Sequence, residues 1–407
     1  MLRLFLENRK IGLCRSSTYR GSGSGLAKAR PYLFVWIVVG SILLSFCGCS
    51  VVDEAFDEVE DGLVSTIIGT PKEVKGVSTD RIGYQSLKPK GQKAYDQIVD
   101  CILTHEDKAT LSIKDPEICD RAFSAVMADY GGLFWVSGYS YQTYGKGDET
   151  IGFVFEPSYT MTQDERMQMQ KKIDRVVENW LSELPADADD YQKAKFVFET
   201  LIDRVDYDRK SDNNQNIISV FLGNETVCQG YANATNYLLW QLGIPAITVT
   251  GDAKNESHAW NVIELDGEYY CMDTTWGNSM YLDLDKNKVK HINYAYLNVT
   301  SEELFVTHTP DNKLHIPEAT GTKDNYFRRE GLFFDTWDEE AIGVALSNDY
   351  YNRNPMVSLK FSNAELYHQA RHFFIDEGHL ADYCEGLDSV TYMDSEDTLV
   401  LTVEYPF

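Results

Sequence analysis

The segment HAWNVIELDGEYYCMDTTW, residues 258–276, decides which fold this chain of 407 residues adopts. Apolar and polar residues alternate on both sides of Asp266-Gly267, and Asp-Gly between two such runs is the strongest short-range signal for a β-hairpin. A two-residue loop at these positions pairs Leu265 with Glu268. We therefore predict an antiparallel hairpin over 258–276, and a symmetric four-residue loop would keep the same register.

The register of this hairpin places a histidine and a carboxylate on one face. Counting outward from the loop, Trp260 faces Asp273 and His258 faces Thr275. His258, Trp260 and Asp273 then project from the same face, because side chains alternate between faces along a strand. His258 and Asp273 are diagonal neighbours about 7–8 Å apart at the backbone, which is within side-chain reach. A loop of odd length would move Asp273 to the other face.

The stretch TVCQGYA, residues 226–232, places a cysteine at the expected start of a helix. The helical pattern continues to Leu242, and Gly243 followed by Pro245 is a typical C-terminal signal. Free N–H groups and the positive end of the helix dipole stabilise a thiolate at Cys228. The N–H groups of Cys228 and Gln229 are candidates for holding the oxyanion that forms during acyl transfer.

Each of these residues alone has an ordinary structural explanation. A single Cys is more often a packing residue, a single His a satisfied polar group, and a strand Asp a turn or edge feature. Cys228, His258 and Asp273 together fit a catalytic triad, in which the carboxylate fixes the imidazole tautomer and the imidazole takes the thiol proton. Cys271 shares the face of Asp273 but has no helix terminus beside it, so we expect it to be a core thiol.

The segments VCQGYA and GDAKNESHAWNVIELDGEYYCMDTTW resemble the core of bacterial transglutaminase-like proteins, members of the papain-like cysteine superfamily. VDYD at 205–208 and YAYLNVTSEELFVTH at 294–308 resemble the segments that flank that core. The resemblance implies an α+β fold in which the helix bearing Cys packs on an antiparallel sheet bearing His and Asp. It implies that Cys228 is the nucleophile, His258 the general base and acid, and Asp273 the orienting carboxylate, without a cofactor.

The chemistry expected of such a triad is attack of Cys228 on an amide carbonyl of a protein or peptide, giving a thioester. Transfer to an amine is cross-linking, and transfer to water is proteolysis or deamidation. The same triad serves all three, so the acyl acceptor stays open. Tyr207 and Trp260 are candidate walls of the site, with core packing an equal alternative for each. A surface module that binds protein or wall glycopeptide, with little catalysis, is the alternative function.

The first fifty residues are typical of an export segment. Seven Lys and Arg residues and one acid precede an apolar run at 31–46, which is shorter than the ~20 residues of a membrane span. The following FCGCS resembles a bacterial lipobox, in which Cys49 would be lipidated and become the new N-terminus. We expect a signal segment over 1–49 and an extracytoplasmic, lipid-anchored or secreted protein. Ordinary signal cleavage and an uncleaved anchor are the alternatives.

The remaining residues divide into four predicted parts. An acidic tether is expected over 50–86, an N-terminal α+β region over 87–160, the catalytic core over 161–320, and a small α+β domain over 321–407. The length allows two or three domains. Hydrophobic residues make up 43% of the chain, which is typical of globular proteins and excludes a wholly disordered one.

The net charge limits which macromolecules the protein is expected to bind, and the spacing of its Cys and His residues limits which metal sites are expected. The formal net charge of −26 repels nucleic acid and anionic membrane surfaces, and favours neutral or basic protein partners. No CxxC pair or Cys/His cluster has zinc spacing, and His368 and His372, one helical turn apart, lack a third ligand, so no metal is expected. Cys101 and Cys119 lie on apolar helix faces and are expected to be buried thiols rather than a disulfide. The oligomeric state stays open.

Overall fold

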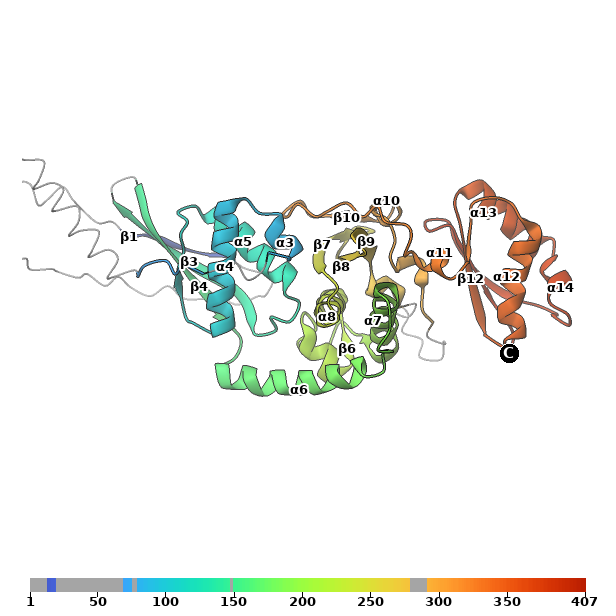
Figure 1. The fold of residues 1–407 in the computed structure, drawn as a ribbon, viewed down its shortest axis with the longest axis horizontal. Helices are drawn as coiled ribbons and strands as arrows, with labels where there is room; N and C mark the ends of the chain where they lie inside the picture. The colour runs from blue at the N-terminus through green and yellow to red at the C-terminus, as the bar shows by residue number, and fades with distance from the viewer. Residues whose placement is uncertain (1–12, 20–68, 75–78, 147–148, 279–290) are drawn as a thin grey trace, which may run out of the picture. The chain divides into compact units, whose positions relative to one another are not determined.

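The computed structural model describes residues 13–19, 69–74, 79–146, 149–278 and 291–407 (Figure 1). Helices and mainly antiparallel sheets are both present, so the predicted α+β class is confirmed. The apolar run at 31–46 and Cys49 lie outside the described residues. Within the described part, no helix combines the length and the apolar character that a membrane crossing requires.

The chain divides into two compact units. The first includes residues 88–123 and 135–163, and the second includes 78–87, 124–134 and 164–407. The first unit holds a sheet of strand order β1-β3-β4-β2. Its elements are helices α4 (Pro89–Thr104) and most of α5 (Pro116–Asp129), and strands β1 (Leu13–Tyr19), β2 (Ala109–Thr110), β3 (Val136–Lys146) and β4 (Glu149–Tyr159).

The core of the first unit forms where α5 meets the hairpin of β3 and β4. The ring of Phe123 lies 4.6 Å from Tyr139 and 6.0 Å from Phe155, centroid to centroid. Cys101 and Cys119 are buried and carry free thiols. The prediction of two buried thiols is therefore confirmed, and the disulfide alternative is not realised.

A short helix, α3 (Ile82–Gln85), lies inside the range expected to be tether. Ile82 is buried, and the Asp129 carboxylate accepts hydrogen bonds from the backbone N–H groups of Gly83 and Tyr84, at 2.8 and 2.9 Å. Gly83 permits this close approach because a Cβ there would lie 2.7 Å from the carboxylate. The folded part thus begins before residue 86, earlier than the composition indicated.

The centre of the second unit is a helix on a sheet of strand order β10-β7-β8-β9. Helix α8 packs against β7 and β8, and α7 packs against α8. The helix that begins with Cys228 therefore lies on the antiparallel sheet that carries His258, as predicted. The elements are helices α6 (Gln163–Leu181), α7 (Asp190–Arg204) and α8 (Cys228–Gln241), and strands β7 (Ala246–Ala253), β8 (Glu256–Leu265), β9 (Glu268–Met272) and β10 (His308–Pro310).

The predicted hairpin register is confirmed, although its second strand is shorter than expected. Leu265 pairs with Glu268, and the ladder runs to Asn261 opposite Met272. Strand β9 ends there, and Asp273 is the N-cap of helix α9 (Thr274–Gly277). The expected strand pairing of His258 with Thr275 is therefore wrong, because the N-cap side chain of Asp273 binds the next N–H groups and turns the chain into a helix.

Short elements complete the second unit around this sheet. They are the parallel pair β5 (Asp206–Tyr207) and β6 (Glu225–Thr226), a π-helical turn at Ser219–Gly223, a 3-10 turn at Tyr294–Tyr296, α10 (Ser301–Leu304) and α11 (Tyr326–Arg329).

The C-terminal residues form the small α+β module expected from the sequence. Its sheet has the order β11-β12-β14-β13, with β11 parallel to β12 and the other pairs antiparallel. Phe361, Tyr367 and Phe374 are fully buried in its core. The elements are strands β11 (Phe333–Phe334), β12 (Met356–Phe361), β13 (Thr391–Ser395) and β14 (Val400–Glu404), helices α12 (Glu339–Tyr351), α13 (Ala364–Arg371) and α14 (Leu380–Tyr383), and a π-helical turn at His372–Asp376.

Candidate active site

Cys228 is the first residue of α8, and no side chain caps this helix end. The thiol therefore lies at the positive end of the helix dipole, beside N–H groups that the helix itself leaves free. Gly230 is required here because a Cβ would lie 1.8 Å from Oγ1 of Thr226. That hydroxyl is held in place, since it accepts a hydrogen bond from Ser219 and donates one to the carbonyl of Asn214.

Exposure separates Cys228 from Cys101, Cys119, Cys271 and Cys384. Cys228 is partly exposed, and the other four are buried. Burial raises the pKa of Cys101 and Cys271 to about 12 and that of Cys384 to about 11, and it also raises the pKa of Cys119. These four thiols stay protonated at neutral pH, so Cys228 is the one of these five cysteines that is suited to nucleophilic chemistry.

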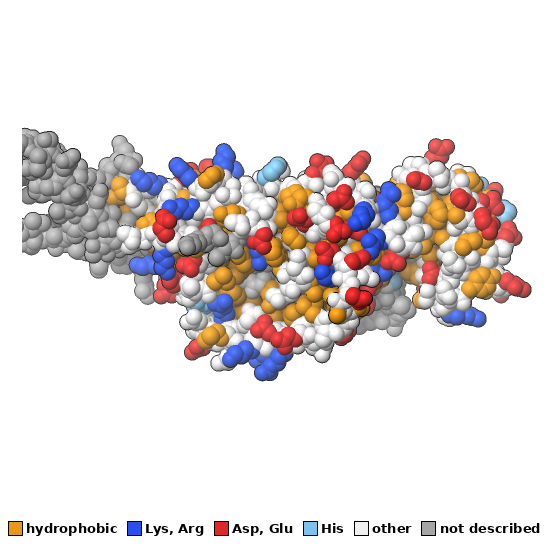
Figure 2. Space-filling model, in the orientation of Figure 1, with side chains coloured by type: hydrophobic (Ala, Val, Ile, Leu, Met, Phe, Trp, Pro, Cys, Tyr) orange, Lys and Arg blue, Asp and Glu red, His pale blue; other side chains and the backbone are white. Residues whose placement is uncertain are grey.

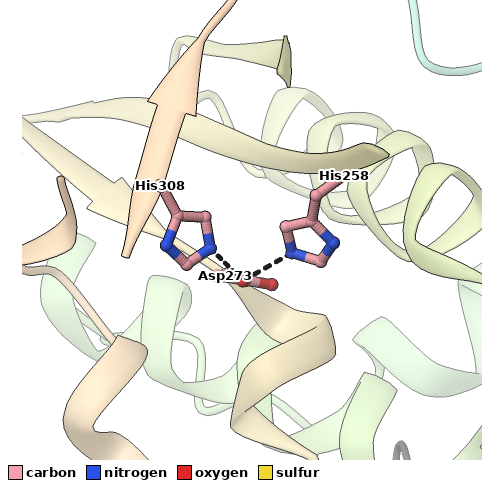
Figure 3. Close-up of side chains that lie close together, drawn as sticks. All are labelled: His258, Asp273 and His308. Atoms are coloured by element: carbon pink, nitrogen blue, oxygen red, sulfur yellow. Dashed lines mark hydrogen bonds and ion pairs between the residues drawn. The ribbon is translucent and has the colours of Figure 1, made fainter. Parts of the chain in front are cut away.

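His258 lies on β8, opposite Gly251 of β7, and is 9% exposed. Its Nε2 is 2.8 Å from Oδ2 of Asp273 (Figure 3). The Nδ1 atom is therefore the ring nitrogen left for Cys228. The ring of Trp276 lies 5.7 Å from the imidazole, centroid to centroid, and covers one side of it.

Asp273 is fully buried and has hydrogen-bond donors at both oxygens. Oδ1 accepts the backbone N–H groups of Thr275 at 2.9 Å and Trp276 at 3.1 Å, as an N-cap does. Oδ2 accepts from His258 and from a second imidazole, that of His308, whose Nε2 is 3.1 Å away. The carboxylate thus has two donors at each oxygen.

His308 is a site residue that sequence reasoning missed. It is the first residue of β10, which pairs with β7 through His308 and Ala253, and its side chain is fully buried. The rings of His308 and His258 are 5.3 Å apart, on two sides of the same carboxylate (Figure 3). The sequence held only a weak signal, since His308 ends the segment that resembles the flank of the core, and nothing local links it to Asp273.

The charges of His258 and Asp273 decide the protonation state of each. Burial opposes the charged form of His258, but the charge of Asp273 and hydrogen bonds with Asp273 and Cys228 outweigh it and raise the pKa of His258 to about 10. Burial likewise opposes ionisation of Asp273, but the charge of His258 and hydrogen bonds from His258 and His308 hold the pKa of Asp273 well below its usual range. Near neutral pH the pair is therefore an imidazolium and a carboxylate.

Cys228 and His258 open onto one cavity of about 460 Å³. Tyr207 lines it, as predicted for a wall residue, together with Trp276 and Gln215. Its rim carries Arg209, Lys254 and Glu256, all exposed. The cavity is large enough for an amino-acid side chain and the adjoining backbone of a peptide.

Two other predicted site residues have different roles. Trp260 is 1% exposed and does not line the cavity; it packs behind the two imidazoles, 6.2 Å from His258 and 5.1 Å from His308, so the core-packing alternative holds for it. The side chain of Gln229 donates to Asn233 at 3.0 Å, which leaves its backbone N–H as the group for oxyanion binding.

The side chains of His258, Asp273 and His308 have the spacing of a metal site, with ligand-type atoms within 4.8 Å of one another. Hydrogen bonds already account for this arrangement, because Oδ2 accepts from both imidazoles and Oδ1 from two N–H groups. A metal ion would have to displace both imidazole protons. We interpret the cluster as hydrogen-bonded, and the absence of a metal stays a prediction.

Known proteins resemble the segment that carries most of this site. Residues 179–274 match the family model of the transglutaminase-like superfamily. The kyphoscoliosis peptidase of Mus musculus is 24% identical over 185 residues, which is 39% of this chain and 28% of that protein. The Homo sapiens kyphoscoliosis peptidase is 27% identical over 127 residues, or 27% of this chain and 19% of that protein. The chain thus matches less than a third of the length of either relative.

Among solved structures, a TGase crystal structure aligns with 13% identity and a TM-score of 0.26, covering 38% of this chain and 46% of that one. The superfamily match includes Cys228, His258 and Asp273 and ends before His308. Residues 179–274 of this chain are thus similar to the transglutaminase-like superfamily, whose members are mostly cysteine-dependent enzymes.

Proposed function

We propose that this protein is a cysteine-dependent acyl transferase or hydrolase that acts on amide bonds of proteins or peptides. One observation carries the proposal: a helix-initial cysteine and a histidine from a separate element open onto the same cavity, and a buried carboxylate holds that histidine from behind. Packing alone does not explain an imidazole held at 2.8 Å by a buried carboxylate beside a partly exposed thiol.

The first half of the reaction forms a thioester. The Cys228 thiolate attacks the amide carbonyl, and backbone N–H groups at the start of α8 stabilise the oxyanion. The C–N bond then breaks as the imidazolium of His258 donates its Nδ1 proton to the departing amine. Asp273 keeps the proton on Nε2 throughout, so the reactive nitrogen always faces Cys228.

The second half releases the acyl group. Neutral His258 takes a proton from an incoming amine or water, which attacks the thioester carbon and expels the Cys228 thiolate. An amine gives a cross-link, and water gives proteolysis or deamidation. The triad treats both acceptors alike, so the cavity walls decide between them.

The net charge of the chain supports neutral or basic substrates. The formal net charge is −26, and acidic side chains are spread over the face seen in Figure 2. The two cations at the cavity rim are both paired with carboxylates, Arg209 with Glu256 at 3.0 Å and Lys254 with Asp397 at 2.9 Å. Among the described residues of the rim, each cation therefore already has a carboxylate partner, which gives an acidic substrate little to bind.

The test compares wild type with Cys228→Ala on a casein-like protein and a fluorescent primary amine. Incorporated label shows transfer, and fragments or released ammonia show hydrolysis. Cys384→Ala is the matched control, because this thiol is buried in the core of the C-terminal module, and it should behave as wild type. Equal results for wild type and Cys228→Ala would contradict the enzyme and favour the surface-binding module.

We also propose that the protein is exported and anchored through a lipid on Cys49. The FCGCS segment after a basic and apolar leader supports this. Growth of an expressing bacterium with an alkyne fatty acid should label the protein, and Cys49→Ala should abolish the label. Equal labelling of Cys49→Ala and wild type would contradict the anchor.

A further inference from the structure

The imidazole of His308 has a fixed hydrogen-bonding role. Asp273 is ionised, so its oxygens only accept, and the 3.1 Å contact requires a proton on Nε2 of His308. On the other side of the ring, Nδ1 lies 2.8 Å from Oγ1 of Thr307 and 3.2 Å from the carbonyl of Leu304. Nδ1 can accept from the threonine hydroxyl or donate to the carbonyl, so the ring donates Nε2–H to Asp273 whether neutral or charged.

The fold holds this ring firmly against the carboxylate. His308 is fully buried, and its ring is 4.5 Å from Trp276 and 5.1 Å from Trp260, centroid to centroid. Strand β10 can approach β7 closely because Gly251 has no side chain; a Cβ there would lie 2.2 Å from the carbonyl oxygen of Thr309, the residue after His308. In the described part of the chain, Asp273, His258 and Tyr296 are the titratable side chains that face the ring.

We propose that His308 is a positioning residue: by donating Nε2–H to Oδ2 of Asp273, it fixes the carboxylate in the orientation that holds the His258 imidazole. The two N–H groups of α9 fix only Oδ1. Within the described residues, the groups that hydrogen-bond Oδ2 are the imidazoles of His258 and His308, so these two rings limit rotation of the carboxylate. The charge of His258 changes with each proton transfer, and with it the strength of its hydrogen bond to Oδ2. His308 donates to the same oxygen through these changes and so keeps the carboxylate in place.

This inference rests on the proposed function, and its test separates the two. The assay is alkylation of Cys228 by iodoacetamide as a function of pH, which needs no amide substrate. His308→Gln and His308→Met have unbranched side chains of similar length, and only Gln has an N–H donor near the position of Nε2. His258→Ala provides the reference for a lost imidazole, and His315→Gln, at an exposed histidine, is the control.

We expect His308→Met to slow alkylation at pH 7 by roughly 10- to 100-fold and to move the acidic limb of the pH profile to higher pH, because a loosely held His258 stabilises the thiolate less. His308→Gln should stay within roughly a factor of three of wild type, since one donor is retained. With an amide substrate, His308→Met should lower kcat and leave KM unchanged. A profile for His308→Met that matches wild type, or that moves to lower pH, would overturn the role of His308.

The His258→Ala variant distinguishes failure of the proposed triad from failure of the positioning role of His308. If His258→Ala also leaves alkylation unchanged, the proposed triad itself fails; if His258→Ala slows the reaction and His308→Met does not, only the positioning role fails. A second measurement is made on wild type and does not depend on the folding of a variant. Imidazole nitrogen NMR should show His308 protonated at Nε2 at every pH where Cys228 reacts, and a ring protonated only at Nδ1 would overturn the proposal.

Discussion

Replacing Asp273 by Asn tests the central interaction of the site with a minimal change in shape. Asn would keep an oxygen for the N–H groups of Thr275 and Trp276, now accepted at Oδ1. The amide N–H₂ would then face Nε2 of both His258 and His308, where a carboxylate oxygen now accepts. His258 could accept that donor only in the tautomer that carries its proton on Nδ1, so it could no longer take a proton from Cys228.

The magnitude follows from the protonation of His258. The difference between the ordinary pKa of 6.5 and the value of about 10 in the fold corresponds to about 5 kcal/mol in favour of the imidazolium. Without the charge of Asp273, burial of the ring dominates and opposes the charged form. The imidazolium form of His258 is then lost at neutral pH. The expected fall in kcat is about 10⁴-fold, as for the same change in a Ser-His-Asp triad.

The assay is the pH profile of the amide reaction, supported by iodoacetamide alkylation of Cys228. In wild type, His258 stays charged until the pH rises through about 10, so the rate should fall above that pH as the leaving amine loses its proton donor. In Asp273→Asn this limb should move to pH 6.5 or below. Asp129→Asn is the matched control, because Asp129 is also fully buried and also accepts two backbone N–H groups, yet lies away from the cavity.

If Asp273→Asn kept a rate within tenfold of wild type with the same limb near pH 10, the carboxylate would not govern His258. Circular dichroism and urea unfolding accompany the assay, since a broken buried charge pair costs about 3–5 kcal/mol of stability. Loss of activity in Asp273→Asn supports the role of the carboxylate only if that variant is folded. Asp129→Asn should lose stability through the same kind of contact and retain the alkylation profile of wild type.

Three further predictions concern stability and reactivity. Gly230→Ala should lower the free energy of unfolding by about 1–3 kcal/mol in urea, because its Cβ meets Thr226 at 1.8 Å, whereas Gly223→Ala, with open space around it, should be near neutral; equal effects would contradict the close approach. Mass spectrometry of the folded protein after brief iodoacetamide treatment should find label on Cys228 and little on the four buried thiols, those of Cys101, Cys119, Cys271 and Cys384, until urea is added. Rapid labelling of these four thiols in the folded protein would be inconsistent with their raised pKa values. His258 is charged more readily in the fold than in the unfolded chain, so its stabilising contribution is complete below pH 6.5 and is lost as the pH rises to about 10; the stability of wild type relative to His258→Gln should fall across that window, and a constant difference would count against the assigned charge.

Local patterns in the sequence were enough to predict most of the site. The Asp-Gly turn set the pairing of Leu265 with Glu268, and this register placed His258 and Asp273 within reach of each other. Helix signals placed Cys228 at the start of α8. These predictions depended on contacts between residues close in the chain, where turn geometry and periodicity constrain the backbone strongly. The end of β9 was missed because a strand residue and an N-cap Asp look alike until the following N–H groups are placed.

Contacts between distant segments required the tertiary structure. Local sequence patterns were sufficient to predict the α+β class, the hairpin, the helix that begins with Cys228 and the small C-terminal module. Only the fold decided that Trp260 is a core residue, that Cys228 and His258 share a cavity, and that His308 meets Asp273 from the far edge of the sheet. Strand β10 reaches β7 after a separation of more than fifty residues, and such pairing depends on the packing of the whole unit rather than on any local propensity.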